Sequence, residues 1–161
     1  MRPLTHAVSP TVLALAVLWA CGPGSGSSTH ARLTDLVTRY AAAWSGQSPD
    51  SLASFYAEHG SLTVNGGAPS VGRAAIRATA AGFMTAFPDM LVVMDSVIGN
   101  GNHAVFYWTW TGTNTGPGGT GMPVHISGYE EWTLDADGLI AESLGHYDQD
   151  EYQRQVSGGK R

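Results

Sequence analysis

The chain has 161 residues, of which 43% are hydrophobic and 13% are charged, and its formal net charge is −5. This length suits one domain of ordinary size and is short for two. Because phosphate binding needs clustered cations and the sequence has no basic run, we expect no nucleic-acid partner.

An apolar run, "TVLALAVLWA" at residues 11–20, ends at Cys21. About 10 apolar residues cannot span a bilayer, which needs about 20, but they suit the core of a signal peptide. The stretch "LWAC" resembles the lipobox of bacterial lipoproteins. We therefore expect a signal peptide at residues 1–21 and an exported protein held on the outer side of a bacterial membrane by a lipid on Cys21. The alternative is an ordinary secretory signal with an incidental cysteine.

Cys21 is the only cysteine, so an intramolecular disulfide is excluded and the domain must rest on its own packing. The Gly- and Ser-rich residues 22–30 predict a flexible linker. We expect the globular domain at residues 31–155 and a disordered tail at 156–161.

Three helices are predicted in the first half of the domain. Apolar residues at intervals of three and four predict the first helix over 32–44, with an inward face of Leu33, Leu36, Val37, Tyr40 and Trp44. Ser48 and Pro49 suit the N-cap and first turn of a second helix that ends at His59, with Leu52, Phe55 and Tyr56 on one face. The third helix spans 73–87, points Ile76, Phe83 and Phe87 inward, and is weakened by Gly82.

Strands fill the second half. A short strand at 61–64 precedes the third helix, and four strands follow it, at 90–98, 103–113, 123–134 and 139–147. Helices followed by a meander of strands predict an α+β fold, with the helices on one face of a curved antiparallel sheet.

The strand at 123–134 alternates between two faces, and its core face contains a carboxyl group. The inward set is Val124, Ile126, Gly128, Glu130, Trp132 and Leu134. A buried Glu130 must find hydrogen-bond partners or hold a proton at a raised pKa. In the preceding strand, Ala104, Phe106, Trp108 and Trp110 face inward. In the last strand, either Ser143, Gly145 and Tyr147 or the alternate set Glu142, Leu144, His146 and Asp148 could do so.

Large aromatic residues interleaved with Gly and Ser are typical of a ligand pocket. The candidate ligand-binding residues are Trp44, Phe55, Phe106, Trp108, Trp132 and Tyr147. Two alternatives stay open, namely a solid core filled by the tryptophans and a purely structural role for Glu130.

The order of elements resembles the nuclear transport factor 2-like fold, a cone of three helices against a curved antiparallel sheet, and the resemblance covers about residues 31–155. It is carried by "LVTRYAAAWSGQSPDSLASFYAEHGSLTV", "VGRAAIRATAAGFMTAFPDM", "WTGTNTG" and "DGLIAESLGHYDQDEYQRQ". The pieces "FPD" and "HYDQDEYQRQ" are similar to SnoaL-like proteins. This fold hosts ketosteroid isomerases, SnoaL-type polyketide cyclases and many non-catalytic domains.

The resemblance implies candidate catalytic residues. "RYAAAW" is similar to the isomerase segment that bears the oxyanion-hole tyrosine, here Tyr40, and the isomerase's protonated aspartic acid corresponds to Glu130. The isomerase's general base would fall near residues 64 and 65, which are Val and Asn and take no proton. The acid–base aspartate of SnoaL-type cyclases corresponds to Asp148, with His146 beside it. Asp148 could instead cap the helix predicted after it.

The six histidines show no metal-ligand spacing, and neither a nucleophile elbow nor a phosphate or dinucleotide loop occurs where a strand would precede a helix. We therefore expect no metal and no cofactor. The sequence predicts a SnoaL-like domain that binds a small hydrophobic molecule in a cone-shaped cavity, with or without cofactor-independent acid–base chemistry. The alternative is a non-catalytic binding module or a dimeric scaffold; the resemblance implies a homodimer that pairs through its sheet.

Overall fold

The computed structural model describes residues 25–159 as four helices and six strands. In chain order they are α1 (Ser25–Ser45), α2 (Pro49–Ser54), β1 (Tyr56–Val64), β2 (Ser70–Val71), α3 (Arg73–Ala86), β3 (Leu91–Asn100), β4 (His103–Thr113), β5 (Pro123–Leu134), β6 (Ile140–Tyr147) and α4 (Gln149–Val156). The predicted signal peptide and Cys21 lie outside the described residues. No helix within 25–159 is both long enough and apolar enough to cross a membrane.

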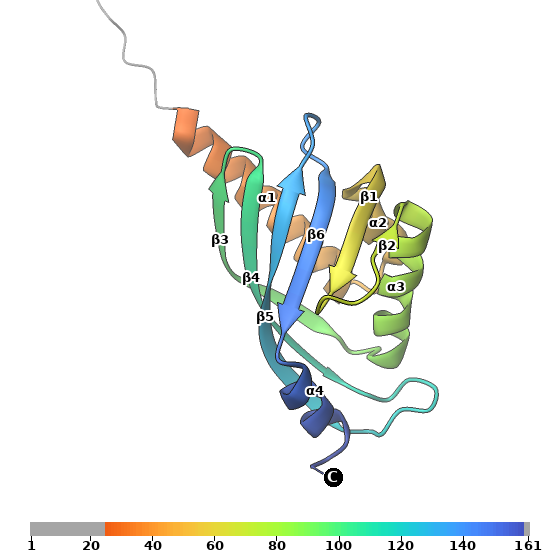
Figure 1. Ribbon diagram of the computed structural model, residues 1–161. Helices are drawn as coiled ribbons and strands as arrows, with labels where there is room; N and C mark the ends of the chain where they lie inside the picture. Colours follow the sequence, from red (N-terminus) through yellow and green to blue (C-terminus); the bar gives the residue numbers. More distant parts are fainter. Residues whose placement is uncertain (1–24, 160–161) are drawn as a thin grey trace, which may run out of the picture.

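The strands form one curved sheet in the order β2-β1-β6-β5-β4-β3. Strands β3 to β6 form the predicted antiparallel meander, and β1 joins it by pairing in parallel with β6. In Figure 1, α1 crosses behind the sheet and α3 stands beyond the edge strand β2. The predicted α+β class is therefore confirmed, with one parallel pair added to the sheet.

Helix α1 begins at Ser25, within the Gly- and Ser-rich segment that is predicted to be a flexible linker. No proline interrupts the chain between Pro23 and Pro49, so the backbone can stay helical upstream of the apolar positions. The hydroxyls of Thr34 and Thr38 donate to the carbonyl oxygens four residues earlier, as helical geometry allows. The predicted start at residue 32 marks only where the helix meets the core.

Helix α2 is shorter than predicted. Its N-cap is Ser48, whose Oγ accepts a long hydrogen bond of 3.4 Å from the Ser51 N–H, and Pro49 occupies the first turn. The helix ends at Ser54 instead of His59, because the chain at Phe55 and Tyr56 turns into β1. The N–H of Ile140 donates to the carbonyl of Phe55, so pairing with β6 overrides the local helical pattern.

The core lies between α1, α3 and the concave face of the sheet. The inward sets predicted for β4 and β5 are buried, including Phe106 and Trp132. In β6, where the sequence left two choices, Ser143 and Gly145 are the buried set. Residues 142, 144 and 146 therefore belong to the outer face of the sheet.

Helix α3 and the start of β3 are held to the sheet by the "FPD" segment. Ile76 and Phe87 are fully buried at the two ends of the helix. The carboxylate of Asp89 accepts hydrogen bonds from both the backbone N–H (2.6 Å) and the hydroxyl (2.7 Å) of Thr113 at the end of β4. These contacts fix where α3 ends relative to the sheet, and hence where Phe83 lies.

We predict that Gly82→Ala stabilises the protein. Gly82 lies in the interior of α3 on an exposed surface, and a Cβ added there meets no atom within 4 Å. Alanine in place of glycine in a helix should raise the free energy of unfolding by about 0.5–1 kcal/mol. Urea denaturation checks this value.

Gly116→Ala is the matched control, because its Cβ would lie 2.0 Å from the carbonyl oxygen of Thr85 at the end of the same helix. It should destabilise the fold. A loss of stability in Gly82→Ala would contradict the described surroundings of α3.

Candidate functional site

A carboxyl group inside the core accepts three hydrogen bonds on one oxygen. Glu130 is 7% exposed, and its Oε2 accepts from the Ser143 hydroxyl at 2.7 Å, the Trp132 indole N–H at 2.9 Å and the Tyr40 hydroxyl at 3.0 Å. The Tyr40 hydroxyl in turn lies 2.9 Å from that of Tyr56. The three donors come from α1, β5 and β6, so the network ties the helix layer to the sheet.

The second oxygen of the carboxyl is free. Within residues 25–159, Glu130 Oε1 accepts no hydrogen bond, and it is not among the polar side-chain atoms that are enclosed without a partner. Glu130 also lines the pocket described below. One oxygen is therefore fixed by the protein and the other is open to a guest.

The protonation equilibrium of this group is shifted toward the neutral acid. Burial raises the pKa of Glu130, while the hydrogen bonds from Ser143, Trp132 and Tyr40 act in the opposite direction. Burial, helped by the nearby carboxyl, also raises the pKa values of Tyr40 and Tyr56 above the ordinary value of 10.0. Both tyrosines therefore stay protonated as donors at neutral pH.

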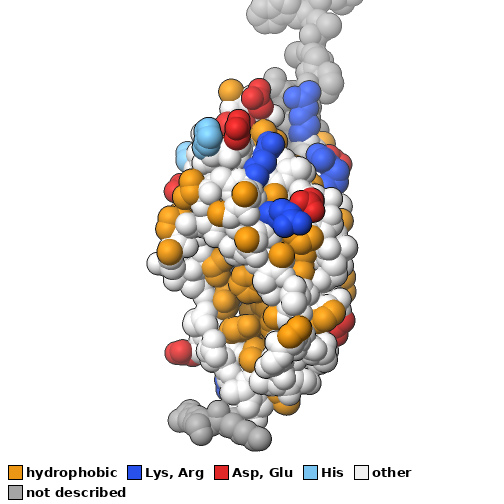
Figure 2. All heavy atoms as spheres, turned by 90° about the vertical axis from the view of Figure 1, so that its right-hand side faces the viewer, with side chains coloured by type: hydrophobic (Ala, Val, Ile, Leu, Met, Phe, Trp, Pro, Cys, Tyr) orange, Lys and Arg blue, Asp and Glu red, His pale blue; other side chains and the backbone are white. Residues whose placement is uncertain are grey.

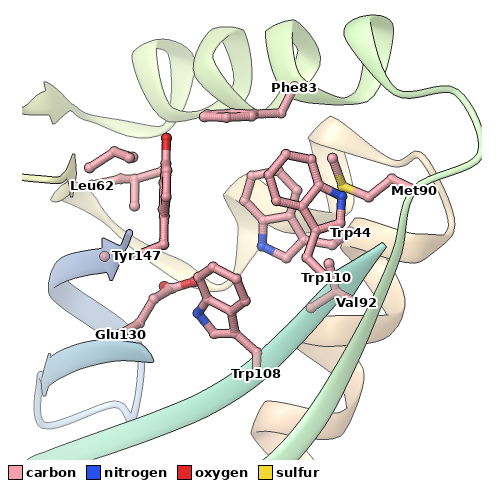
Figure 3. A pocket seen from close by; sticks show the side chains of 11 residues that line it. Trp44, Leu62, Phe83, Met90, Val92, Trp108, Trp110, Glu130 and Tyr147 are labelled. Carbon is pink, nitrogen blue, oxygen red and sulfur yellow. The ribbon is translucent and has the colours of Figure 1, made fainter. Parts of the chain in front are cut away.

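Beside Glu130 lies an apolar pocket. Its aromatic lining consists of Trp44, Phe83, Trp108, Trp110 and Tyr147, and its aliphatic lining of Leu62, Val64, Met90 and Val92. Figure 2, which views the α3 side, shows a hollow lined by hydrophobic side chains. In Figure 3 the rings of Phe83 and Tyr147 are seen edge-on, so that their faces bound the space from two sides.

The pocket has a volume of about 70 Å³. An engineered cavity of about 150 Å³ in another protein takes one benzene molecule. The hollow therefore has room for a small group and not for a fused ring system, because the tryptophans fill much of the cone. Of the two alternatives that the sequence leaves open, each describes part of the cone: a small pocket is present, and tryptophans fill the space around it.

Two indole groups in the lining have unpaired donors. The Nε1 atoms of Trp108 and Trp110 are enclosed and have no hydrogen-bond acceptor among the described residues. Burying a hydrogen-bond donor without an acceptor lowers the free energy of unfolding by about 1–3 kcal/mol. Trp110 packs against Phe87 with ring centroids 4.8 Å apart and stacks on Tyr152 at 5.9 Å, which shows how closely this wall is packed.

The structure separates the candidate residues into two layers. Trp44, Trp108, Tyr147 and Glu130 line the pocket. Tyr40 lies behind them, fully buried, and contacts two lining residues: Glu130 through a hydrogen bond and Trp44 edge-on. The remaining three candidate ligand-binding residues are not in the lining; Phe106 and Trp132 are enclosed by the core, and Phe55 packs edge-on against Tyr40.

Asp148 does not meet the expectation of a pocket acid or base. It is exposed and is the N-cap of α4, where its carboxylate accepts the N–H of Glu151 at 2.9 Å. The cap places the side chain at the helix end and outside the lining. Asp148 is therefore a helix cap, which is the alternative role that the sequence allows.

His146 is also outside the pocket. It belongs to the outer set of β6 and stacks on Tyr129, with ring centroids 4.7 Å apart. The register pairs His146 with Tyr129, and Tyr129 with Tyr107, across neighbouring strands. The aromatic pairing fixes His146 on the sheet face opposite Glu130, so the two do not form an acid–base pair.

Several site residues were missed by sequence reasoning. Tyr56 has helical spacing in the sequence, so its hydrogen bond to Tyr40 could not be predicted. Ser143 belongs to one of two possible inward sets of the last strand, so its hydrogen bond to Glu130 could not be predicted either. Phe83 and Trp110 were predicted to face inward but not to line a pocket. Within the described part of the chain, no cluster of His, Cys, Asp or Glu could hold a metal ion.

Comparison with known proteins gives the family context. The model of the SnoaL-like domain family matches residues 37–143. No curated protein matches the sequence significantly.

Among solved structures, a putative SnoaL-like polyketide cyclase from Jannaschia sp. CCS1 superposes with a TM-score of 0.71 at 21% identity, covering 80% of this chain and 93% of that one. A protein of ketosteroid isomerase-like fold from Catenulispora acidiphila, solved in complex with trimethylamine, has a TM-score of 0.69 at 21% identity, with 76% and 92% covered. A putative polyketide cyclase from Xanthomonas campestris pv. campestris has a TM-score of 0.61 at 24% identity, with 79% and 98% covered. At these identities the likeness establishes the fold.

We predict that Glu130 makes stability depend on pH. In the folded protein its pKa is raised above the ordinary 4.5, so the folded state keeps a proton that the unfolded chain releases. This contribution is fully present below pH 4.5 and is lost as the pH rises through the raised pKa. Glu130→Gln keeps an acceptor oxygen and removes the titration, so its free energy of unfolding should decline less across this window.

Urea denaturation at a series of pH values measures the difference between wild type and variant. Glu131→Gln, which changes the exposed neighbour on the same strand, should follow the wild type. Parallel pH curves for wild type and Glu130→Gln would contradict the raised pKa.

Proposed function

Since the chain belongs to the SnoaL-like domain family, we propose that it binds a small hydrophobic molecule, or the hydrophobic head of one, in the pocket beside Glu130. The observation that carries the proposal is an apolar lining with a single buried carboxyl, whose Oε1 accepts no hydrogen bond among residues 25–159. Apolar walls with few fixed polar groups are the usual composition of a small-molecule site.

The size of the pocket favours a small guest. A volume of about 70 Å³ suits a few non-hydrogen atoms and excludes a whole polyketide or steroid skeleton unless the walls move. The neighbour from Catenulispora acidiphila was solved with trimethylamine, which is a guest of this size. The three hydrogen bonds to Oε2 hold the carboxyl in place, so binding requires little reordering of this group.

Cofactor-independent acid–base chemistry is the second candidate. Its support is the raised pKa of Glu130, which brings a proton donor into an apolar site next to Tyr40. Val64 lines the pocket where the isomerases would have a general base, and the Asn65 side chain is engaged by the N–H of Tyr147 and by Gln149. The lining holds neither a second carboxyl nor an imidazole, and burial raises the pKa of its Tyr147 hydroxyl, which favours binding without chemistry. Accelerated exchange of the α-hydrogens of cyclohexanone in heavy water would favour the enzyme.

We also propose that the protein is exported and lipid-anchored through Cys21, and that it pairs through the outer sheet face. Support for the anchor is the "LWAC" sequence, and support for the dimer is the exposure of Val93, Ile98 and Tyr107. An exported location argues against a cytoplasmic role in polyketide synthesis. A non-catalytic binding lipoprotein fits all of these features.

We predict that small apolar probes bind in the pocket. Benzene and cyclohexanone should each bind saturably, with one edge of the ring in the pocket and the rest in its open side, and should change the fluorescence of the lining tryptophans. Val92→Phe fills the pocket from β3 and should weaken binding at least about tenfold, which corresponds to about 1.4 kcal/mol.

Val93→Phe is the matched control, because the neighbouring residue on the same strand is 48% exposed and faces away from the pocket. Its affinity should equal that of the wild type. If neither probe binds the wild type, or if both variants bind alike, the proposed binding site is wrong.

For the anchor, metabolic labelling with a radioactive fatty acid should mark the full-length protein in the membrane fraction of a bacterial host. The Cys21→Ser variant should lose the label. A labelled Cys21→Ser variant, or an unlabelled wild type, would refute lipidation at this residue.

A further inference from the structure

The charges around the pocket have one sign. Glu130 is the only charged or basic residue in the lining, and neither His, Lys nor Arg contributes to it. The remaining wall is aromatic or aliphatic, apart from Gly145 and the hydroxyl of Tyr147. A ligand that enters therefore meets one acidic group in apolar surroundings.

The carboxyl is arranged to hold negative charge but has no cation. Three donors converge on Oε2, and hydrogen bonds of this kind favour the carboxylate over the neutral acid. A buried carboxylate also needs a partner of opposite charge to be stable. Within residues 25–159 no cationic side chain makes an ion pair with Glu130. Without a cation the group is shifted toward the neutral acid, and a cationic guest would supply the opposite charge that favours the carboxylate.

The aromatic walls suit the same kind of guest. Cations bind to the faces of aromatic rings, and cages of several rings recognise quaternary ammonium groups in particular. Phe83 and Tyr147 present ring faces to the space in Figure 3, with Trp108 beside the Glu130 carboxyl. Perpendicular ring pairs, such as Phe83 and Trp110 at 88°, keep these walls at fixed angles.

We propose that the pocket binds the methylated ammonium head group of a small organic cation, which the Glu130 carboxylate neutralises and the surrounding aromatic rings enclose. The proposal rests on the proposed function, since it names the ligand class of the same pocket. The head group has few non-hydrogen atoms, in keeping with a volume of about 70 Å³, and the rest of the molecule leaves through the open side. A neutral guest would leave the carboxyl shifted toward its neutral acid, whereas a cation would favour the carboxylate.

The test compares choline with 3,3-dimethylbutan-1-ol, which has the same shape without the charge. Calorimetric titration of the full domain should give choline at least about tenfold higher affinity than the neutral alcohol. Glu130→Gln should remove this preference, and Glu131→Gln, on the outer face of the same strand, should keep it.

The sign of the pH dependence separates a cation from a neutral guest. Choline affinity should rise with pH through the pKa of Glu130, because binding requires the carboxylate. The titratable groups that face Glu130 are the hydroxyls of Tyr40 on α1, Tyr56 on β1 and Tyr147 on β6. Burial raises the pKa of each above 10.0, so none of them titrates in the same range.

The ring contribution is tested at Tyr147. Tyr147→Leu should lose roughly 3- to 30-fold in choline affinity, whereas Tyr107→Leu, which changes an exposed tyrosine on the outer face of the sheet, should bind choline like the wild type. Equal or tighter binding of the neutral alcohol, or choline affinity that falls with rising pH, would overturn the inference. If benzene and cyclohexanone bind but choline does not, the inference fails and the proposed function stands; if none of the probes binds, both fail.

Discussion

The structure depends on satisfying one buried carboxyl group. Glu130 sits on the concave face of the sheet, and its Oε2 receives donors from the helix layer, from its own strand and from the next strand. Loss of any donor would leave a polar group with fewer partners in an apolar core, at a cost of about 1–3 kcal/mol. The position of α1 across the sheet is thus fixed by a specific hydrogen bond as well as by apolar packing.

This network divides the carboxyl into two parts with different roles. Oε2 has a structural role, because it holds α1, β5 and β6 together. Oε1 has no partner within the described residues and lies at the pocket. A purely structural carboxylate would be expected to use both oxygens, since each has lone pairs to satisfy. The asymmetry is the reason to assign Glu130 a function beyond stability.

Local sequence patterns predicted the sheet well and the site only in part. In β4 and β5 the inward positions are mostly large and apolar and the outward positions mostly polar, so their bounds and faces could be read directly. β6 could not be oriented, because Ser143 and Gly145 are no more apolar than Leu144 and His146; pairing with β5 decides it. Register places Gly145 opposite Glu130, where the absence of a side chain leaves room for the carboxyl.

The helical prediction at Tyr56 and the expectation of a pocket position for His146 and Asp148 share a cause. Leu52, Phe55 and Tyr56 have helical spacing, but Tyr56 pairs with Ile140 some 80 positions later, which no local pattern reveals. The "HYD" segment suggested chemistry because its residue types are reactive. Stacking of His146 on Tyr129 is a geometric fact that residue type does not encode, whereas residue type allowed both a catalytic Asp148 and the helix cap that it forms.

The hollow itself results from small residues on the inner face of the sheet. A Cβ added to Gly128 would lie 2.5 Å from the six-membered ring of Trp108, so the indole lies across β5 over this glycine. Gly145, on the next strand, lines the pocket and contributes no side chain to it. Ordinary apolar residues at both positions would fill the cone, as Phe106 and Trp132 do elsewhere on the same face. The pocket therefore exists because Gly128 lets the Trp108 indole lie beside Glu130 and Gly145 leaves the adjoining space empty. Its shape is determined by the same strands that position Glu130.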